Sequence, residues 1–190
     1  MYNVDMATPY TTSLAVQNYL QQTLKASFSS QLTAYIEAMS EYCDELAGFP
    51  IYRTDETERK YDGCGLSTQQ IDHVHTITEV TVSGAVVEPL QVPYNSDVKT
   101  ELKLPAGVFT PGAANVSVTG IHCLRKELPA SVAHACTVFV AIILRQVKEQ
   151  RGGVKSEKIG EYSVTFASDE ERLDYQMAVE AVKALRPISF

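Results

Sequence analysis

Two histidines in the middle of the chain are candidates for metal binding or catalysis. His73 and His75 are two residues apart, so a strand would direct both imidazoles to one side and could begin a metal site. The other histidines, His122 and His134, and the scattered carboxylates have no metal-site spacing that would complete it. We therefore expect a polar strand face near Asp72 and no bound metal.

Cys64 lies between two glycines and could be an exposed nucleophile in a turn. A cysteine nucleophile needs a histidine and a carboxylate to activate and orient it, and no such pattern of known spacing accompanies Cys64. A tight turn accounts for the glycines. A small cytoplasmic cysteine hydrolase that uses Cys64 with His73 or His75 is the alternative from another functional class. An unusually reactive thiol would favour it.

The stretch Gly152-Gly153-Val154-Lys155-Ser156 has the composition of a phosphate-binding loop without its pattern. Such a loop follows a strand and has a glycine directly before the lysine. Here a valine precedes the lysine, and the residues before the stretch have helical spacing. The sequence therefore predicts no catalytic residue, no nucleotide site and no cofactor.

The charge balance is acidic: 23 Asp and Glu against 16 Lys and Arg give a formal net charge of -7. A surface that grips DNA needs clustered basic residues, so we expect no specific DNA binding. The first residues lack the basic and apolar regions of a secretory signal. The apolar run Val138 to Leu144 is far shorter than the roughly 20 residues that span a bilayer. We expect a cytoplasmically made protein with reduced cysteines and no membrane contact.

Three segments in the first and last thirds of the chain have helical spacing and recognisable ends. The first, Ser13 to Leu24, follows threonines that can cap its start. The second runs from about Ser30 to Ala47 and stops at a glycine. The third begins at Pro129 and ends before Gly152-Gly153.

A fourth helix is predicted near the C-terminus. Before it, Glu157 to Phe166 has the pattern of an extended arm or short strand. Ser168 and Glu171 then have the spacing of a capping box, and Pro187 closes the helix. Its apolar stripe, expected to face the core, consists of Leu173, Met177, Ala181 and Leu185.

Between the second and third helices, from Ile51 to about Cys123, β-branched residues, glycines and prolines replace the helical spacing. Three runs are predicted to be strands: Thr76 to Val82, Lys99 to Leu104 and Asn115 to Ile121. Ser83-Gly84 follows the first of them and predicts a hairpin turn.

The predicted fold class is α+β: mainly a helical bundle of about four helices with a β-rich insertion between the second and third. One domain is expected over residues 1–190. Its helical core would comprise residues 12–48 and 127–186, its insertion about 51–123, and its C-terminal tail 187–190.

The third helix has apolar residues on several faces, Ile142 and Leu144 among them. Such a helix is either central to its bundle or buried partly against another subunit. We predict a contact between subunits that involves Ile142 and Leu144, together with Ile159 and Tyr162 of the arm.

The order and spacing of several motifs carry a family resemblance. These are Leu32 to Ala38 with Ala47 to Ile51, Arg59 to Gly65 (similar to a Y-D-G-x-G turn), Asn115 to Gly120 (similar to an N-V-x-V-T strand), and Leu128-Pro129-Ala130 with Ser156 to Val164. Together they cover about residues 12–190. The chain resembles the head-to-tail adaptor proteins, also called connector or head-completion proteins, of tailed bacteriophages and gene transfer agents.

The resemblance implies a non-enzymatic virion protein of the neck, assembled in the host cytoplasm. It would form a ring, expected to be twelve-fold, beneath the portal. The implied partners are the portal protein, neighbouring copies, a stopper or tail-completion protein, and double-stranded DNA that passes without specific binding. The alternative among virion proteins is another neck or tail-joining subunit, such as a stopper or tail terminator.

The resemblance also implies that the C-terminal end of the chain reaches toward the portal. Ile188 and Phe190 follow the fourth helix and would be an apolar anchor. Arg186 would meet a carboxylate of the portal.

Overall fold

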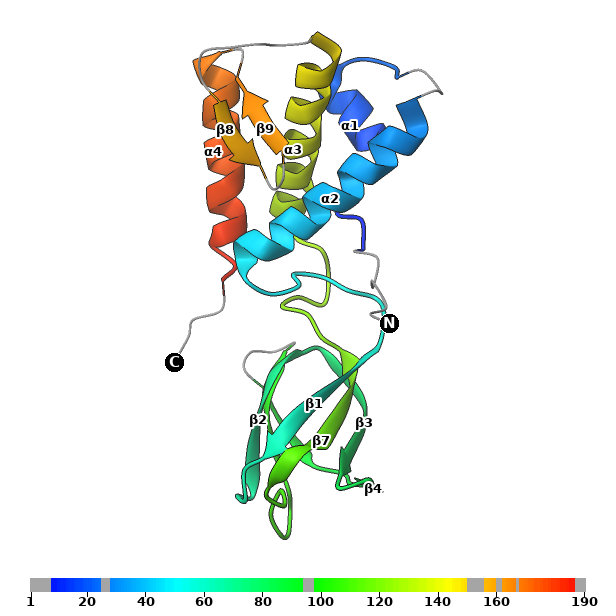
Figure 1. Ribbon diagram of the computed structural model, residues 1–190, viewed down its shortest axis with the longest axis vertical. Coiled ribbons are helices and arrows are strands. Elements are labelled where there is room, and N and C mark those ends of the chain that lie inside the picture. Colours follow the sequence, from blue (N-terminus) through cyan, green and yellow to red (C-terminus); the bar gives the residue numbers. More distant parts are fainter. Residues whose placement is uncertain are drawn as a thin grey trace. The chain divides into compact units, whose positions relative to one another are not determined.

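The computed structural model describes residues 8–24, 28–93, 98–149, 156–159, 162–166 and 168–186 (Figure 1). The chain divides into two compact units, one made of Met1–Phe49 with Leu128–Phe190 and the other of Pro50–Glu127. The first unit holds the four described helices, and the second holds seven strands. The expected α+β class is confirmed. That both units make up one adaptor domain stays a prediction.

Helix α1 (Ser13–Leu20) is shorter than expected. It begins where the Thr12 hydroxyl accepts a hydrogen bond from the Ala15 N–H at 3.1 Å. It stops at Gln21, whose left-handed backbone (φ 52°) turns the chain before Leu24. The N–H of Gln21 donates to the carbonyl of Asn18, which closes the last turn.

Helix α2 (Ser29–Ala47) ends as its sequence predicts. Gly48 has a φ of 78°, and its N–H donates to the carbonyls of Asp44 and Glu45. A residue without a Cβ takes this left-handed conformation at little cost, which is why glycine ends so many helices. The buried face of α2 includes Leu32, Ile36, Met39 and Cys43.

Helix α3 (Ala130–Glu149) is the most deeply buried of the described helices. Every residue from Val138 to Leu144 is at most 5% exposed, because α1, α2, α4 and β9 all contact the helix, as Figure 1 shows. The apolar residues of this central stretch are therefore covered within the subunit. Ile142 and Leu144 lie in this core at 2% and 5% exposure, and their predicted part in a subunit contact stays a prediction.

The stretch Ala130–Val147 of α3 is long and apolar enough to cross a membrane, judged by length and composition alone. Most of that stretch is buried inside the protein. Burial among neighbouring helices is the ordinary reason for a helix that is apolar all round.

Helix α4 (Asp169–Lys183) begins at the predicted cap, where the Ser168 hydroxyl accepts the Glu171 N–H at 3.1 Å. Its core face differs from the predicted stripe. Leu173 and Met177 are 55% and 63% exposed, whereas the buried residues are Glu171, Tyr175, Ala178, Val179 and Val182. A strict four-residue spacing advances ~40° around the helix at each step, so it leaves the core side, while mixed spacings of three and four stay on it.

An aromatic cluster joins α2, α3 and α4. Phe139 meets Tyr42 and Tyr175 edge-on, with ring centroids 5.4 Å and 5.6 Å apart. Phe166, just after β9, lies 5.4 Å from the Tyr175 ring. The hydroxyls of Tyr42 and Tyr175 are 3.1 Å apart and share a hydrogen bond. The cluster fixes the inner face of α4 against the bundle.

The second unit contains two antiparallel sheets. One has the order β1-β7-β3-β4 and the other β2-β6-β5. The strands are β1 (Thr57–Gly63), β2 (Thr68–Val74), β3 (Thr76–Val82), β4 (Ala85–Val86), β5 (Leu90–Pro93), β6 (Lys99–Lys103) and β7 (Gly112–Ile121). The two sheets share one apolar core, formed by Ile71, Val74, Val80, Val82, Leu102, Phe109, Val116 and Val118.

The three predicted strands correspond to β3, β6 and β7, and the predicted hairpin joins β3 to β4. Its central residues, Ser83 and Gly84, have φ values of 51° and 81°, as a type I′ turn requires. Strands β1, β2 and β5 were not predicted, because β1 and β2 are rich in polar and charged residues and β5 is short.

The segment after α3, which the sequence predicted as an extended arm, contains two strands that pair with each other. β8 (Ser156–Ile159) and β9 (Tyr162–Thr165) form a two-stranded antiparallel sheet. Ile159 and Tyr162 are opposite each other in its register. The sequence predicted extended structure here, and the backbone pairing makes it a hairpin.

Candidate functional site

The two candidate metal ligands do not share a strand face. His73 lies in β2, but β2 ends at Val74 and His75 follows it in a bend. Burial lowers the pKa of His73, and the carboxylate of Asp72 opposes that shift. The Nδ1 of His75 is 2.7 Å from the Thr76 hydroxyl. Across the part of the chain that the structure describes, no group of three or more His, Cys, Asp or Glu residues is placed to hold a metal ion.

Cys64 is not paired with an imidazole. Its exposed thiol donates to the Thr68 carbonyl at 2.9 Å. Thr68 begins β2, and His73 is five residues further along it. At a strand rise of about 3.3 Å per residue, roughly 17 Å separates the start of β2 from His73. His73 therefore lies too far from Cys64 for the nucleophile and base contact that a cysteine hydrolase needs.

Asp72 accepts two hydrogen bonds on the strand face where the sequence predicted polar residues. Arg59 donates to its carboxylate at 2.8 Å, and the Tyr61 hydroxyl donates to the same oxygen at 3.3 Å. Burial, with a further contribution from Asp72, raises the pKa of Tyr61 to about 12. Both members of the ion pair are partly exposed, so it contributes at most about 1 kcal/mol.

His122 is the most perturbed histidine that the structure describes. It is 2% exposed, and its Nε2 lies 3.4 Å from the Val118 carbonyl. Its Nδ1 is buried without a hydrogen-bond partner. Burial, and then the nearby Arg59, lower the pKa of His122 to about 4. The imidazole is held neutral within the strand unit.

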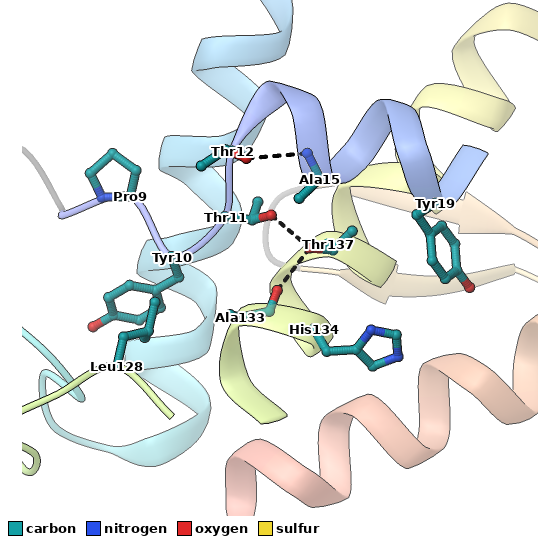
Figure 2. A pocket seen from close by; sticks show the side chains of 10 residues that line it. All are labelled: Pro9, Tyr10, Thr11, Thr12, Ala15, Tyr19, Leu128, Ala133, His134 and Thr137. Carbon is teal, nitrogen blue, oxygen red and sulfur yellow. Dashed lines mark hydrogen bonds between the residues drawn. The ribbon is translucent and has the colours of Figure 1, made fainter. Parts of the chain in front are cut away.

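A recess of about 500 Å³ opens in the helical unit beside α1 and the start of α3 (Figure 2). The segment before α1, α1 itself and the first turns of α3 supply its walls. It is lined by Pro9, Tyr10, Thr11, Thr12, Ala15, Tyr19, Leu128, Ala133, His134 and Thr137. The recess was not predicted from the sequence, because it is made by segments more than 100 residues apart.

The threonine hydroxyls that line the recess make hydrogen bonds within the protein. The Thr11 and Thr137 hydroxyls are 2.6 Å apart, and Thr137 donates to the Ala133 carbonyl at 2.8 Å (Figure 2). Thr12 caps α1. These bonds tie the segment before α1 to α3 and leave no activated nucleophile among them.

Tyr10 ties the same segment to α2. Its N–H donates to the Ser40 hydroxyl at 2.9 Å, and its own hydroxyl donates to the buried carboxylate of Asp44. Asp44 and Ser40 therefore have structural partners. The Tyr10 hydroxyl, like the threonine hydroxyls of the recess, is thus engaged in a hydrogen bond within the protein.

Tyr19 connects α1 with α3 and α4. Its hydroxyl donates to Asp174 at 3.3 Å, and its ring meets the exposed His134 edge-on at 6.0 Å. The Arg145 guanidinium lies 5.8 Å from the ring centroid and pairs with the buried Glu171 at 3.3 Å. Burial, and then Asp174, raise the pKa of Tyr19. The inward side of α4 is thus held by polar as well as aromatic contacts.

The predicted portal-binding residues are only partly described. Arg186 is exposed, and its Nε donates to the Leu46 carbonyl of α2 at 2.7 Å. Ile188 and Phe190 lie outside the described residues. Ile159 and Tyr162 lie opposite each other in the backbone pairing of β8 with β9.

Solved structures resemble this chain over nearly its whole length. A chain of "Neck of empty GTA particle computed with C6 symmetry" has 12% sequence identity and a TM-score of 0.59, covering 97% of this chain and 91% of that one. A chain of "Neck of native GTA particle computed with C12 symmetry" has 14% identity and a TM-score of 0.52, covering 93% and 91%. A chain of "Virion of native gene transfer agent (GTA) particle" has 11% identity and a TM-score of 0.55, covering 100% and 94%.

No protein-family model and no curated protein matches the chain. At these low identities, the likeness to the three solved chains is one of fold.

Proposed function

We propose that this protein is a head-to-tail adaptor of a tailed phage or gene-transfer-agent particle. It is a non-enzymatic neck subunit, made in the host cytoplasm, that joins the DNA-filled head to the tail. The observation that carries the proposal is the fold likeness to chains of gene-transfer-agent neck structures across 93–97% of this chain. Fold alone does not fix function, so the proposal also rests on the residues.

The architecture that we propose is a four-helix bundle interrupted by a β-rich insertion. Strands β1 to β7 come between α2 and α3 in the sequence and form a compact unit of their own. The other three helices pack around α3. A subunit of this kind has a rigid helical part and a separate β unit, each able to contact a different neighbour.

We propose that copies of the chain form a closed ring, expected to be twelve-fold, beneath the portal. Two of the similar chains belong to neck structures computed with C6 and C12 symmetry. A ring requires head-to-tail contacts between two different surfaces of the subunit. The β8–β9 hairpin, in which Ile159 and Tyr162 are opposite each other, is one proposed part of that contact.

The C-terminal end is the proposed portal contact. Arg186 is exposed at the end of the helical unit, and Ile188 and Phe190 follow it in the sequence. Two apolar side chains beside a cation suit a groove that has an acidic rim. A stopper or tail-completion protein is the proposed partner on the side of the ring away from the portal.

The acidic composition fits the proposed passage of DNA through the ring. A net charge of -7 repels phosphates at the low and moderate salt of cells, so DNA can move past without specific binding.

The experiment is removal of the gene from a genome that encodes the particle, with complementation by the intact chain. The proposal predicts filled heads without tails, and restored tails on complementation. Normal tailed particles in the absence of the protein would refute the adaptor role. Binding of the purified chain to the tail but not to the portal would favour the stopper or tail-terminator alternative.

A further inference from the structure

Two loops at one end of the strand unit carry exposed apolar side chains. Residues 64–67 join β1 to β2, and residues 104–111 join β6 to β7. The loop after β1 and the loop before β7 project from the same end of the unit (Figure 1). Leu66, in the first loop, is 62% exposed, and Val108, in the second, is 50% exposed. We call the surface formed by these two loops the loop end.

Hydrogen bonds between the two loops hold the loop end in one arrangement. The Phe109 N–H donates to the Leu66 carbonyl, and the Gly65 N–H donates to the Phe109 carbonyl, both at 2.8 Å. The Phe109 side chain is fully buried in the core of the strand unit. Leu66 and Val108 are therefore carried on a rigid support, so little conformational entropy is lost when a partner covers them.

The loop end carries no charge. Neither loop contains Asp, Glu, Lys or Arg, although these residues make up 21% of the chain. Phosphates and anionic lipid headgroups are bound by basic residues, so the loop end does not fit a nucleic acid or a membrane surface. Exposed apolar side chains without charge around them are typical of the centre of a contact with another protein.

The recess beside α1 has the complementary shape and chemistry. None of its ten lining residues is Asp, Glu, Lys or Arg. Pro9, Leu128 and Ala133 supply apolar groups, and a volume of about 500 Å³ has room for two aliphatic side chains. The Thr11 and Thr137 hydroxyls already make hydrogen bonds within the protein (Figure 2), so an apolar group can cover them without leaving a donor unpaired.

The net charge of the chain favours a contact between copies through these two surfaces. Copies that each carry a net charge of -7 repel one another, and like charges placed across an interface weaken it. The projecting loop end and the hollow recess can meet without that cost, because neither contributes a charged residue.

We propose that the loop end of one copy docks into the recess beside α1 of a second copy, with Leu66 and Val108 as its anchors. The contact is head-to-tail, because it joins two different surfaces, and it can therefore propagate into a ring. The inference rests on the proposed ring and names its interface. The two aliphatic side chains fill a pocket on the neighbour, as anchors at the centre of an interface do.

The first test replaces both anchors, as Leu66→Asp with Val108→Asp, in the full chain. Both side chains are exposed, so the variant should keep the circular dichroism spectrum and melting temperature of the wild type. The protein concentration at which half of the copies are in rings, measured by mass photometry, should rise at least about tenfold, as for loss of central interface residues. The matched control is Leu173→Asp, on α4, where the side chain is 55% exposed. It should assemble like the wild type.

The second test identifies the occupant of the recess by cross-linking. Val108→Cys and Ala133→Cys are made in separate chains, each with Cys64→Ser to remove the exposed native thiol. After the two proteins are mixed and mildly oxidised, a covalent dimer should appear on a non-reducing gel, with the two peptides linked in its mass spectrum. A disulfide needs the two Cβ atoms within about 4.5 Å, so the dimer places Val108 of one copy at the recess of another. Leu173→Cys in place of Val108→Cys is the control and should give no such dimer.

The outcomes separate this docking from the proposed function. Wild-type protein that stays monomeric alone and with portal would overturn both the ring and the docking. Rings formed equally well by the wild type and the Leu66→Asp/Val108→Asp variant would overturn the docking only, as would rings in which the two cysteine variants give no dimer. If the aspartate variant forms rings but fails to bind portal or a tail protein, the loop end serves that partner and the proposal is also overturned.

Discussion

The buried His122 should make the strand unit lose stability as the pH falls. The perturbation is His122→Asn, which keeps a polar side chain of similar reach but removes the titration. In the folded protein the pKa of His122 is about 4, against 6.5 for an unperturbed histidine. Above pH 6.5 the imidazole is neutral in both the folded and unfolded states, so the stability is unaffected. As the pH falls toward 4, the unfolded state gains a proton that the folded state resists.

The size of the stability loss follows from the amount by which the pKa of His122 is lowered. One pKa unit corresponds to 1.36 kcal/mol, so full titration would cost about 3 kcal/mol, and about 2.5 kcal/mol of this is lost between pH 7.5 and 4.5. The loss comes from burial of the ring among strands and then from Arg59 nearby. Hydrogen bonding to the Val118 and Thr57 backbone and the charge of Asp72 partly oppose it.

The assay is hydrogen exchange of the β7 amides, because it reports the opening of the strand unit separately from that of the helices. After correction for the intrinsic pH dependence of exchange, protection in the wild type should fall more steeply than in His122→Asn, by up to about 70-fold at pH 4.5. His134→Gln, which changes an exposed histidine, is the control and should keep the wild-type slope. Parallel pH profiles for the wild type and His122→Asn would refute the reasoning.

Three further predictions concern the core, a close backbone approach and the tail. Ile142→Ala should lower the free energy of unfolding by about 2–5 kcal/mol, whereas Leu173→Ala should change it by less than about 0.5 kcal/mol. Urea denaturation measures both, and equal losses would contradict the assigned faces. Gly120→Ala should disrupt the pairing of β3 with β7, because its Cβ would lie 2.1 Å from a carbonyl oxygen on β3. Unchanged amide protection in β7 would contradict this. Deletion of residues 187–190 should leave the melting temperature unchanged and abolish co-sedimentation with portal, and undiminished portal binding would contradict the proposed anchor.

The elements with local signals could be predicted from the sequence. The Thr12 and Ser168 caps, the left-handed Gly48 and the Ser83-Gly84 turn each depend on one or two residues and their near neighbours. The central position of α3 was one of two options that its apolar pattern allowed. The structure selects that option because the chain itself supplies enough surface to cover the helix.

Other features depend on contacts that the local pattern does not contain. The stripe that begins with Leu173 has apolar spacing, yet the packing of Tyr175 against Phe139 fixes the opposite side of α4 as the core. The recess beside α1 depends on Thr11 meeting Thr137 from far along the sequence. Strand β1 is mostly polar, so its pairing with β7, rather than its composition, makes it a strand.

The most direct test of the adaptor role is electron cryo-microscopy of the full chain mixed with the portal protein of the same genome. The proposed function predicts a closed ring of copies, expected to be twelve-fold, bound coaxially to the portal with an open central channel. Monomers or open filaments that leave the portal bare would contradict it.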